Sequence, residues 1–325
     1  MSGRYLTLLL RKNNMAIQIQ KNIPLAPLTT FKIGGPALAY TEAHSAQDVS
    51  AAIEYAKEQK IPAFIFGGGS NVLFSDTGFP GIVIHCVADS IVVQGDKLVA
   101  AAGAKLLDVV LTAEEHGLSG LEKLSGIPGF LGGAVRGNAG AFGAEISTCL
   151  VSVTAVDLTS GLIKIFQKDE CQFSYRSSFF KQHKEWAILE AEFLFREHKT
   201  SNELAAIRKE TITKREAKHP QNASCAGSFF MNPEVTDQAL LDEFEAETGH
   251  PSKDGKLPAG WLVTHVGLRG KKIGGAQMSD RHPNYLLNTG NATAEDVIML
   301  SSLVKTKVRD ELGIRLQEEV QMVGF

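Results

Sequence analysis

Long apolar runs and blocks of like charge are missing from this sequence. No apolar stretch approaches the roughly 18 consecutive residues that a membrane-spanning helix needs, and the short apolar patch in MSGRYLTLLLRKNN has no small-residue cleavage site. Basic and acidic residues number 33 and 36, and the formal net charge is −3. These absences argue against membrane and nucleic-acid partners. A cytoplasmic location follows as the default expectation.

Cysteine is also scarce, and its positions indicate no metal or disulfide chemistry. The four cysteines fall in no CxxC pair and in no Cys/His ligand spacing; they are Cys86, Cys149, Cys171 and Cys225. Isolated cysteines of this kind are typical of a reduced intracellular protein, in which they fill structural positions. We therefore predict no disulfide and no metal site.

The chain is long enough to form a large apolar core. It has 325 residues, of which 44% are hydrophobic, so two or three domains and an enzyme are expected. Met15, which precedes AIQIQKN, is a second candidate start of the chain. We expect a monomer.

The order of periodic segments predicts an α+β protein with at least two parts. Helical spacing of apolar residues predicts helices over 45–60, 105–117, 202–218, 237–247 and 294–311, with Ser45 as an N-cap and Gly117 as a stop. Short β-branched runs predict strands. Three of these runs, 81–86, 90–96 and 97–103, are expected to form a meander. The other predicted strands are 62–66, 71–74, 149–158, 161–166, 187–195, 226–233 and a terminal strand over 314–323.

The stretch IPAFIFGGGSNVLFSD, residues 61–76, places three glycines between two apolar runs. Glycine lets a ligand approach the main chain, so GGGSN can form a concave nest of N–H groups that binds an anion. The string is neither a P-loop nor a GxGxxG motif opening a helix. A tight strand-to-strand turn is the plain structural alternative.

A second glycine-rich passage favours the ligand interpretation. GIPGFLGGAVRGNAGAFG, residues 126–143, holds seven glycines in eighteen residues, more than one turn requires. Two bare backbone surfaces suit one extended ligand, and a diphosphate cofactor is such a ligand.

Several segments resemble the family of UDP-N-acetylenolpyruvoylglucosamine reductases. The FAD-binding region of that family is similar to TTFKIGGPA (29–37), FGGGSNVLFSD (66–76) and SGIPGFLGGAVRGNAGAFG (125–143). The resemblance continues, in the expected order, through YRSSFFK (175–181), AGSFFMNP (226–233), AGWLVTHVGLRGKKIGGAQMSDRHPNYLLNTGNATAEDV (259–297) and LQEEV (316–320). It covers essentially everything from residue 22 onward.

The resemblance implies an α+β fold of the vanillyl-alcohol-oxidase type (PCMH type), with an FAD-binding part of two α+β subdomains and a smaller α+β substrate-binding domain. The boundaries we expect are 1–21 for an N-terminal extension, 22–88 and 89–200 for the two FAD-binding subdomains, and 201–325 for the substrate-binding domain, whose terminal strand returns to the active site.

The implied reaction is the reduction of UDP-N-acetylglucosamine enolpyruvate to UDP-N-acetylmuramate in peptidoglycan synthesis. NADPH is the reductant, hydride comes from N5 of reduced FAD, and a proton must reach the adjacent carbon. Charge builds on the substrate carboxylate during hydride addition. By resemblance, Arg176 supports that carboxylate, Ser228 donates the proton and Glu319 is the third catalytic residue.

We assign the other site residues from the accessible main chain of the glycine-rich segments and from the same motifs. We expect cofactor contacts from Phe31 and Gly34, from Gly67, Gly68, Gly69, Ser70 and Asn71, and from Gly126, Ile127, Pro128, Gly129, Gly133 and Asn138. For the nucleotide sugar, weaker candidates are Tyr175, Lys218, Asn232 and Gln277.

The catalytic carboxylate is open between two neighbours. Alternation along a terminal strand puts Glu318 in one row with Ile314, Leu316 and Val320. If that row packs on the core, Glu319 points the other way, into a cleft. We assign Glu319 and keep Glu318 as the competitor.

Two departures and two rival functions stand beside this interpretation. Met231 replaces a lysine of many relatives, and no TYG insertion is found, which predicts a shorter and more open lid. Another FAD-dependent oxidase of the same fold is one rival, with Cys149 or His116 as its flavin tether. A flavin-binding module without turnover is the other, and the joint presence of Arg176, Ser228 and a terminal glutamate argues against it.

Overall fold

The computed structural model describes residues 8–9, 17–218 and 223–325, with the side chains of residues 8, 9 and 218 excluded. The candidate start Met15 and the loop after Lys218 lie outside the described residues. The chain forms two compact units. Unit 1 comprises residues 1–24, 36–69 and 78–217, and unit 2 comprises residues 25–35, 70–77 and 218–325. The domain boundaries expected from the sequence stay predictions.

The first sheet of unit 1 is partly parallel. Its strands, in spatial order, are β1 (Leu8–Leu9), β2 (Gln18–Pro24), β3 (Pro36–Ala43), β6 (Phe79–Cys86) and β4 (Ala63–Phe66). Strands β3 and β4 both run parallel to β6, and β2 runs antiparallel to β3. The carboxyl ends of the three parallel strands therefore share one edge, where α/β sheets bind ligands.

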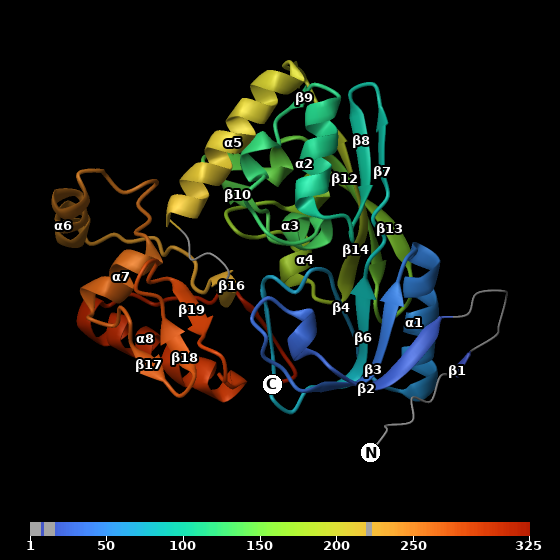
Figure 1. The fold of residues 1–325 in the computed structure, drawn as a ribbon, viewed down its shortest axis with the longest axis horizontal. Coiled ribbons are helices and arrows are strands. Elements are labelled where there is room, and N and C mark those ends of the chain that lie inside the picture. The colour runs from blue at the N-terminus through green and yellow to red at the C-terminus, as the bar shows by residue number, and fades with distance from the viewer. Residues whose placement is uncertain (1–7, 10–16, 219–222) are drawn as a thin grey trace. The chain divides into compact units, whose positions relative to one another are not determined.

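Helix α1 (Ala46–Gln59) forms as the sequence predicts and covers this sheet (Figure 1). The Ser45 hydroxyl accepts a hydrogen bond from Asp48 N at 3.1 Å, which satisfies one of the donors that a helix start leaves open. Lys60 ends the helix in the left-handed conformation. The buried face of α1 packs on β3 and β6 residues in a core that includes Val49, Ile53 and Ile82.

The second sheet of unit 1 is antiparallel throughout. Its order is β13 (Ile163–Gln167), β12 (Leu150–Asp157), β14 (Trp186–Leu194), β8 (Lys97–Ala101) and β7 (Ile91–Gln94). Helices α2 (Leu106–Glu115), α3 (Leu131–Arg136) and α4 (Phe179–Gln182) contribute to its core. The predicted meander is wrong, because β6 pairs in the first sheet while β7 and β8 pair in this one.

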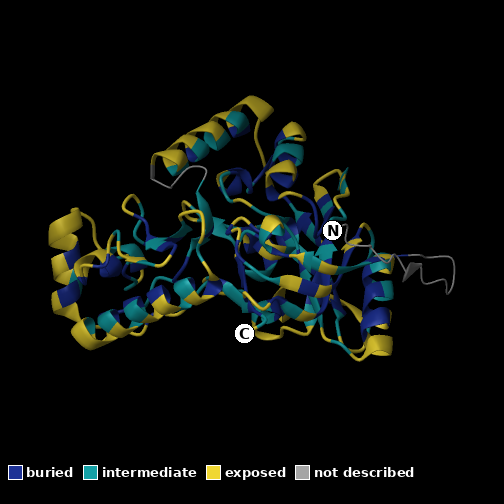
Figure 2. Ribbon diagram, turned by 60° about the horizontal axis from the view of Figure 1, so that its bottom comes forward, coloured by how far each residue is buried: buried dark blue, intermediate teal, exposed yellow. Residues whose placement is uncertain are grey.

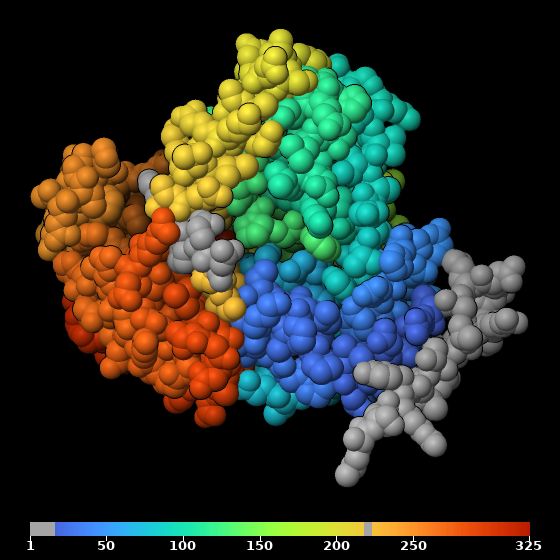
Figure 3. Space-filling view, in the orientation of Figure 1, coloured from blue at the N-terminus to red at the C-terminus, as the bar shows by residue number. Residues whose placement is uncertain are grey.

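Helix α5 (Ser201–Lys218) is a charged helix whose residues 201–217 belong to unit 1. Arg208 donates from Nε and Nη2 to the two oxygens of Glu114 on α2, at 2.7 and 3.1 Å. The pairing raises the pKa of Arg208. Both side chains keep only a minor part of their surface exposed, so this bidentate pair fixes α5 against α2. In Figure 3 the yellow atoms of α5 lie against the green atoms of unit 1.

Unit 2 packs helices on a four-stranded antiparallel sheet. The strands, in order, are β16 (Ser224–Ser228), β19 (Tyr285–Asn288), β18 (Ala276–Met278) and β17 (Lys272–Ile273); the helices are α6 (Gln238–Thr248), α7 (Ala259–His265) and α8 (Ala294–Leu312). Helix α8 begins with a capping box of Thr293 and Asp296. One side of each long helix is buried and the other exposed (Figure 2).

A pair of short parallel strands in unit 2 joins distant parts of the sequence. Strand β5 (Val72–Phe74) pairs with β20 (Gln321–Val323). The predicted terminal strand over 314–323 is therefore wrong over 314–320, where only Glu318 forms an isolated β-bridge. Ile314, Leu316 and Val320 are nevertheless buried as the alternation predicts.

The remaining elements are short. The strands are β9 (Leu118–Ser119), β10 (Gly140–Ala141), β11 (Ala144–Glu145) and β15 (Glu197–His198), and the 3-10 helices span Ala26–Leu28, Glu122–Leu124, Ile146–Thr148 and Lys168–Cys171. The four cysteines are free thiols in the structure. Among the described residues, no helix combines the length and the apolar character that crossing a membrane requires.

Candidate functional site

The first glycine loop, Gly67–Asn71, is not a hairpin turn. It leaves β4, which pairs with β6, and leads to β5, which pairs with β20. The strand-to-strand turn considered as an alternative is therefore wrong. Gly69 has a φ of +61°, a conformation that side chains rarely adopt. The loop thus takes its shape from glycine rather than from strand pairing.

Phe130, from the second glycine passage, packs directly on the first glycine loop. A Cβ on Gly67 would lie 3.0 Å from Cβ of Phe130, and one on Gly68 would lie 3.1 Å from its Cδ1. Any side chain at these positions would push the ring away. The bare backbone of the loop is therefore needed where the two passages meet within unit 1.

The second glycine passage is held by main-chain hydrogen bonds. Gly129, at a φ of +116°, accepts from Leu106 N at 3.0 Å, and Leu131 N donates to Ala104 O at 2.8 Å. Helix α3 begins at Leu131. The sequence did not predict this helix because its glycines disfavour helix formation. Gly133 on α3 is exposed, and no atom would lie within 4 Å of a Cβ there. The passage combines fixed turns with accessible main chain.

Two side chains that sequence reasoning missed fit an anionic ligand here. Ser125 is only 6% exposed, and its hydroxyl has no hydrogen-bond partner among the described residues. Burial lowers the pKa of the Arg136 guanidinium, and no described acidic group opposes that effect. A desolvated cation without a counter-charge is costly, so this segment suits a negatively charged group.

Asn138 is a structural residue of the second passage. Its side chain is fully buried and donates from Nδ2 to Glu145 Oε2 at 2.9 Å and to Ser174 O at 3.0 Å. Its Oδ1 accepts from Ser147 N. These bonds occupy the amide within the protein, so a cofactor contact from Asn138, still a prediction, would come from its main chain.

Arg176 occupies a tight turn of unit 1. Ser174 and Ser177 exchange two main-chain hydrogen bonds of 3.1 Å across the turn. Arg176 itself has a φ of +53°, and its Nη2 donates to Gly140 O at 2.8 Å. Tyr175 lies beside it, with the guanidinium carbon 5.4 Å from the ring centroid. A non-glycine residue in this conformation carries local backbone strain.

Ser228 ends β16 just after an irregularity. The pairing with β19 shifts register between Cys225 and Ser228, and Gly227 has a φ of +76°, with no atom within 4 Å of the position that a Cβ would take. A bulge of this kind re-aims the next side chain. Asn284, which is buried, then fixes the following segment by bonding both the N–H and the carbonyl of Phe230.

The structure brings the segment of Glu319 to that of Ser228 within unit 2. Glu319 N donates to Phe229 O at 2.8 Å, and Met231 N donates to Gln317 O at 2.9 Å. Glu319 O in turn accepts from Asn71 Nδ2 at 3.1 Å. Two of the three predicted catalytic residues therefore lie on hydrogen-bonded neighbouring segments.

Glu318 is engaged elsewhere. Its Oε1 accepts from Lys305 Nζ on α8 at 2.7 Å, and Glu318 forms an isolated β-bridge with Phe230. The carboxylate of Glu318, which alternation places in the apolar row, is therefore already paired with a lysine. The choice between Glu318 and Glu319 as the catalytic carboxylate stays a prediction.

Phe31 and Gly34 serve the packing of unit 2. The Phe31 ring is fully buried in the apolar core of unit 2, and a contact of Phe31 with the cofactor stays a prediction. Gly34 has a φ of +141°, and a Cβ there would lie 2.7 Å from Cβ of Phe74. Its neighbour Gly35 donates to Ser75 O at 2.8 Å.

The weaker substrate candidates have mixed surroundings. Asn232 accepts from Ala259 N at the start of α7, and Gln277 Nε2 donates to Asp280 Oδ2 at 3.2 Å. Tyr175 is 38% exposed. The side chain of Lys218 lies outside the described residues, and the consequence of Met231 stays a prediction. Of the other cofactor candidates, Asn71 and Pro128 are exposed, and Ser70, Gly126 and Ile127 are partly exposed.

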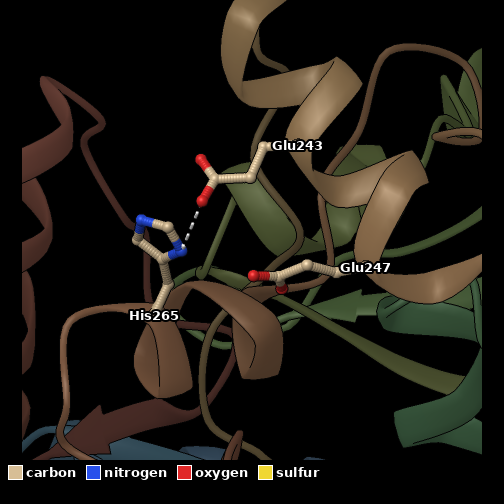
Figure 4. Close-up of side chains that lie close together, drawn as sticks. All are labelled: Glu243, Glu247 and His265. Atoms are coloured by element: carbon tan, nitrogen blue, oxygen red, sulfur yellow. Dashed lines mark ion pairs between the residues drawn. The ribbon is translucent and has the colours of Figure 1, made fainter.

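An exposed group on α6 and α7 has potential metal ligands that the sequence did not indicate. Glu243, Glu247 and His265 offer ligand atoms within 4.8 Å of one another (Figure 4). Glu243 faces His265 at 3.9 Å, and Glu247 accepts from Trp261 Nε1 at 2.7 Å. Because these groups already pair with one another or with Trp261, we assign no metal to them.

Comparison with known proteins defines the class. Residues 37–166 match the FAD binding domain family, and residues 219–323 match the family described as UDP-N-acetylenolpyruvoylglucosamine reductase, C-terminal domain. The protein is an FAD-dependent oxidoreductase. Its fold is the vanillyl-alcohol-oxidase-type FAD-binding fold of two α+β subdomains plus a smaller α+β domain, as the sequence predicted.

Similar proteins define the family within that class. The chain is 36% identical over 308 residues to the UDP-N-acetylenolpyruvoylglucosamine reductase of Solibacter usitatus, covering 95% of this chain and 97% of that one. It is 40% identical over 305 residues to the enzyme of the same name from Paramagnetospirillum magneticum, covering 93% and 91%. The crystal structure of the Thermus caldophilus enzyme is similar with a TM-score of 0.74 at 27% identity, covering 94% of this chain and 99% of that one. The chain belongs to the UDP-N-acetylenolpyruvoylglucosamine reductase family.

Proposed function

We propose that this protein reduces UDP-N-acetylglucosamine enolpyruvate to UDP-N-acetylmuramate, with NADPH as the reductant, in bacterial peptidoglycan synthesis. The observation that carries the proposal is the hydrogen bond between Glu319 N and Phe229 O, which ties the segment of the proposed acid Ser228 to that of a carboxylate. The relatives' names support the substrate. Cytoplasmic location and a monomeric state stay predictions from the sequence.

The glycine passages of unit 1 are the proposed holders of FAD. The N–H groups of Gly67, Gly68 and Gly69 suit the diphosphate. The Ser125 hydroxyl and the Arg136 guanidinium suit it as well, because the hydroxyl has no hydrogen-bond partner among the described residues and burial destabilises the charge of the guanidinium. When bound, FAD supplies hydride transfer from NADPH to the methylene carbon of the enolpyruvyl group. Gly126, Ile127, Pro128, Gly129 and Gly133 are proposed to border the same ligand.

Arg176 is the proposed partner of the substrate carboxylate. Hydride addition delocalises negative charge onto that carboxylate, and a planar guanidinium suits the two oxygens. The hydrogen bond to Gly140 O and the tight turn fix the direction of the side chain before substrate arrives. Such preorganisation lowers the cost of stabilising charge when it develops.

Ser228 is the proposed proton donor to the carbon next to the methylene. A neutral hydroxyl is a weak acid, yet the carbanion-like carbon it protonates is strongly basic, which supplies the driving force. The proton leaves Ser228 Oγ, a C–H bond forms, and water restores the hydroxyl. Gly227 and Asn284 fix the main chain on either side of the serine.

Glu319 is the proposed third catalytic residue. Its main chain is held from both sides, by Phe229 O and by the Asn71 amide. A carboxyl group in its protonated form can donate an O–H to the developing enediolate. Glu318, which pairs with Lys305, is the alternative carboxylate that the sequence left open. Tyr175, Lys218, Asn232 and Gln277 stay candidates for the nucleotide sugar.

The test is turnover by the purified protein. With NADPH and the enolpyruvyl nucleotide sugar, NADPH should be consumed and mass spectrometry should detect a product heavier by two hydrogens. After acid precipitation the flavin should remain in the supernatant, because no covalent tether is expected. FAD bound without NADPH consumption would favour the non-catalytic module, and flavin retained in the precipitate would favour a tethered oxidase.

A further inference from the structure

Asn71 forms two hydrogen bonds that bracket a bend in the C-terminal chain of unit 2. Its Nδ2 donates to Glu319 O at 3.1 Å, and its main-chain carbonyl accepts from Gln321 N at 3.0 Å. Val320, between these two partners, forms the bend and is buried. A carbonyl oxygen only accepts hydrogen bonds, so the contact with Glu319 O identifies the amide nitrogen. One residue thus holds the chain immediately before and immediately after the bend.

The bond from Asn71 lies where another interaction of Glu319 ends. Glu319 N donates to Phe229 O at 2.8 Å, next to Ser228, in a bridge that is isolated and does not extend into a strand. Because the chain bends at Val320, this pairing does not continue past Glu319. The amide of Asn71 bonds the Glu319 carbonyl at this point, so the main chain of Glu319 is held at both its N–H and its carbonyl.

The position of Asn71 is itself fixed by the strand that follows it. All three residues of β5 are buried, and β5 pairs in parallel with β20. Beyond β5, the carboxylate of Asp76 accepts from Ala294 N at 2.9 Å and from Glu295 N at 3.2 Å, at the start of α8. This carboxylate satisfies two of the N–H groups that a helix start leaves open. Asn71 is therefore anchored to the body of unit 2.

We propose that Asn71 is a positioning residue for the reaction, whose side-chain amide holds the main chain of Glu319 so that its carboxyl group is directed at the substrate. The proposal rests on the proposed function, in which Glu319 is the third catalytic residue. It assigns the amide of Asn71 to the protein and not to FAD. The cofactor contact that the sequence predicts for Asn71 is then a contact of its main-chain N–H.

Loss of this bond should affect one half of the reaction only. A catalytic group displaced by about 1 Å loses a large part of its effect on the rate. Glu319 is proposed to act on the enolpyruvyl substrate, so its displacement slows the reoxidation of reduced flavin. Reduction of the flavin by NADPH does not use this carboxyl group. A variant of Asn71 should therefore separate the two half-reactions, whereas a general loss of stability would not.

The experiment compares N71A, N71D, E319Q and the double variant N71A/E319Q with the wild-type holoenzyme. N71A removes the amide. N71D keeps the size of the side chain but sets a carboxylate oxygen, which cannot donate, against the Glu319 carbonyl. The double variant tests whether Asn71 acts through Glu319, because two changes that act through one group do not add. Stopped-flow absorbance of the flavin follows each half-reaction, and the fluorescence of freed flavin after dilution follows FAD release.

N288A is the matched control. Asn288 also belongs to unit 2, and its Nδ2 donates to a distant main-chain carbonyl, that of Phe31, at 3.1 Å. Its Oδ1 accepts in addition from Gly290 N and Ala292 N. Because N288A removes more hydrogen bonds than N71A, it should lose at least as much stability in urea unfolding. Both of its half-reactions should keep wild-type rates.

We expect N71A and N71D to slow reoxidation by the substrate about tenfold or more, and to leave flavin reduction and FAD release within about twofold of the wild type. E319Q should slow reoxidation about 10²-fold, and adding N71A to it should slow the reaction by less than a further factor of about two.

Four results would overturn the proposal alone: wild-type reoxidation in N71A and N71D, multiplied effects in the double variant, rapid loss of FAD from N71A, or equal slowing in N288A. Wild-type reoxidation in E319Q would instead remove Glu319 from the proposed function, and the proposal with it.

Discussion

Arg176 and Ser228 reach their positions by opposite uses of the same backbone conformation. In the turn of unit 1, Arg176 itself lies in the left-handed region, at a φ of +53°. In unit 2 the left-handed residue is Gly227, at +76°, and Ser228, the proposed proton donor, follows it without a positive φ. The strained residue in unit 1 is thus the proposed catalytic residue Arg176 itself, whereas in unit 2 it is a glycine, which adopts a positive φ without steric strain. A substitution at Arg176 should therefore lower turnover with little change in stability, whereas a substitution at Gly227 should lower both.

The largest effect that sharpens this comparison is expected for R176G. Glycine relieves the left-handed backbone but removes the guanidinium, so turnover should fall about 10³-fold. The free energy of unfolding should change by less than about 1 kcal/mol, because the lost bond to Gly140 and the relieved strain offset each other. Steady-state kinetics and urea unfolding measure the two quantities. A stable R176G protein with near wild-type turnover would remove Arg176 from the mechanism.

A smaller effect on turnover, now joined to a loss of stability, is expected for G227A. A Cβ at this φ should cost about 1 kcal/mol, and the shift of the following serine should lower turnover about 10²-fold. The matched control is G249A, because Gly249 ends α6 at a φ of +72° and also has open space around it. G249A should lose similar stability in urea unfolding and keep its turnover. Equal losses of turnover in both variants would indicate that instability alone is responsible.

The sequence predicted the elements whose signals are local. Ser45 caps α1, and Gly117 follows α2 with a positive φ, both as expected. Pairing between distant segments was not predictable in this way. Strand β6 joins β3 and β4 rather than β7, and Gln317 and Glu319 bond to the chain near Phe230 without forming a named strand.

The candidate site shows the same limit at the level of side chains. The family resemblance indicates which residues belong to the motifs but not what surrounds them: Phe31 and Asn138 are fully buried and hold the protein together. The sequence did not indicate Arg136 and His85, because Arg136 is distinguished by its burial and His85 by its contact with Tyr40, a residue distant in the sequence. A histidine in an apolar strand gives no such signal by itself.

The most direct test of the central claim, that Ser228 delivers the proton, is S228A followed through both halves of the reaction by stopped-flow absorbance of the flavin. The control is S224A, which changes a serine of the same strand. Flavin reduction by NADPH should proceed at the wild-type rate in S228A, while its reoxidation by the enolpyruvyl substrate should slow by about 10³-fold or more. Equal slowing of both halves, or wild-type reoxidation in S228A, would contradict the account.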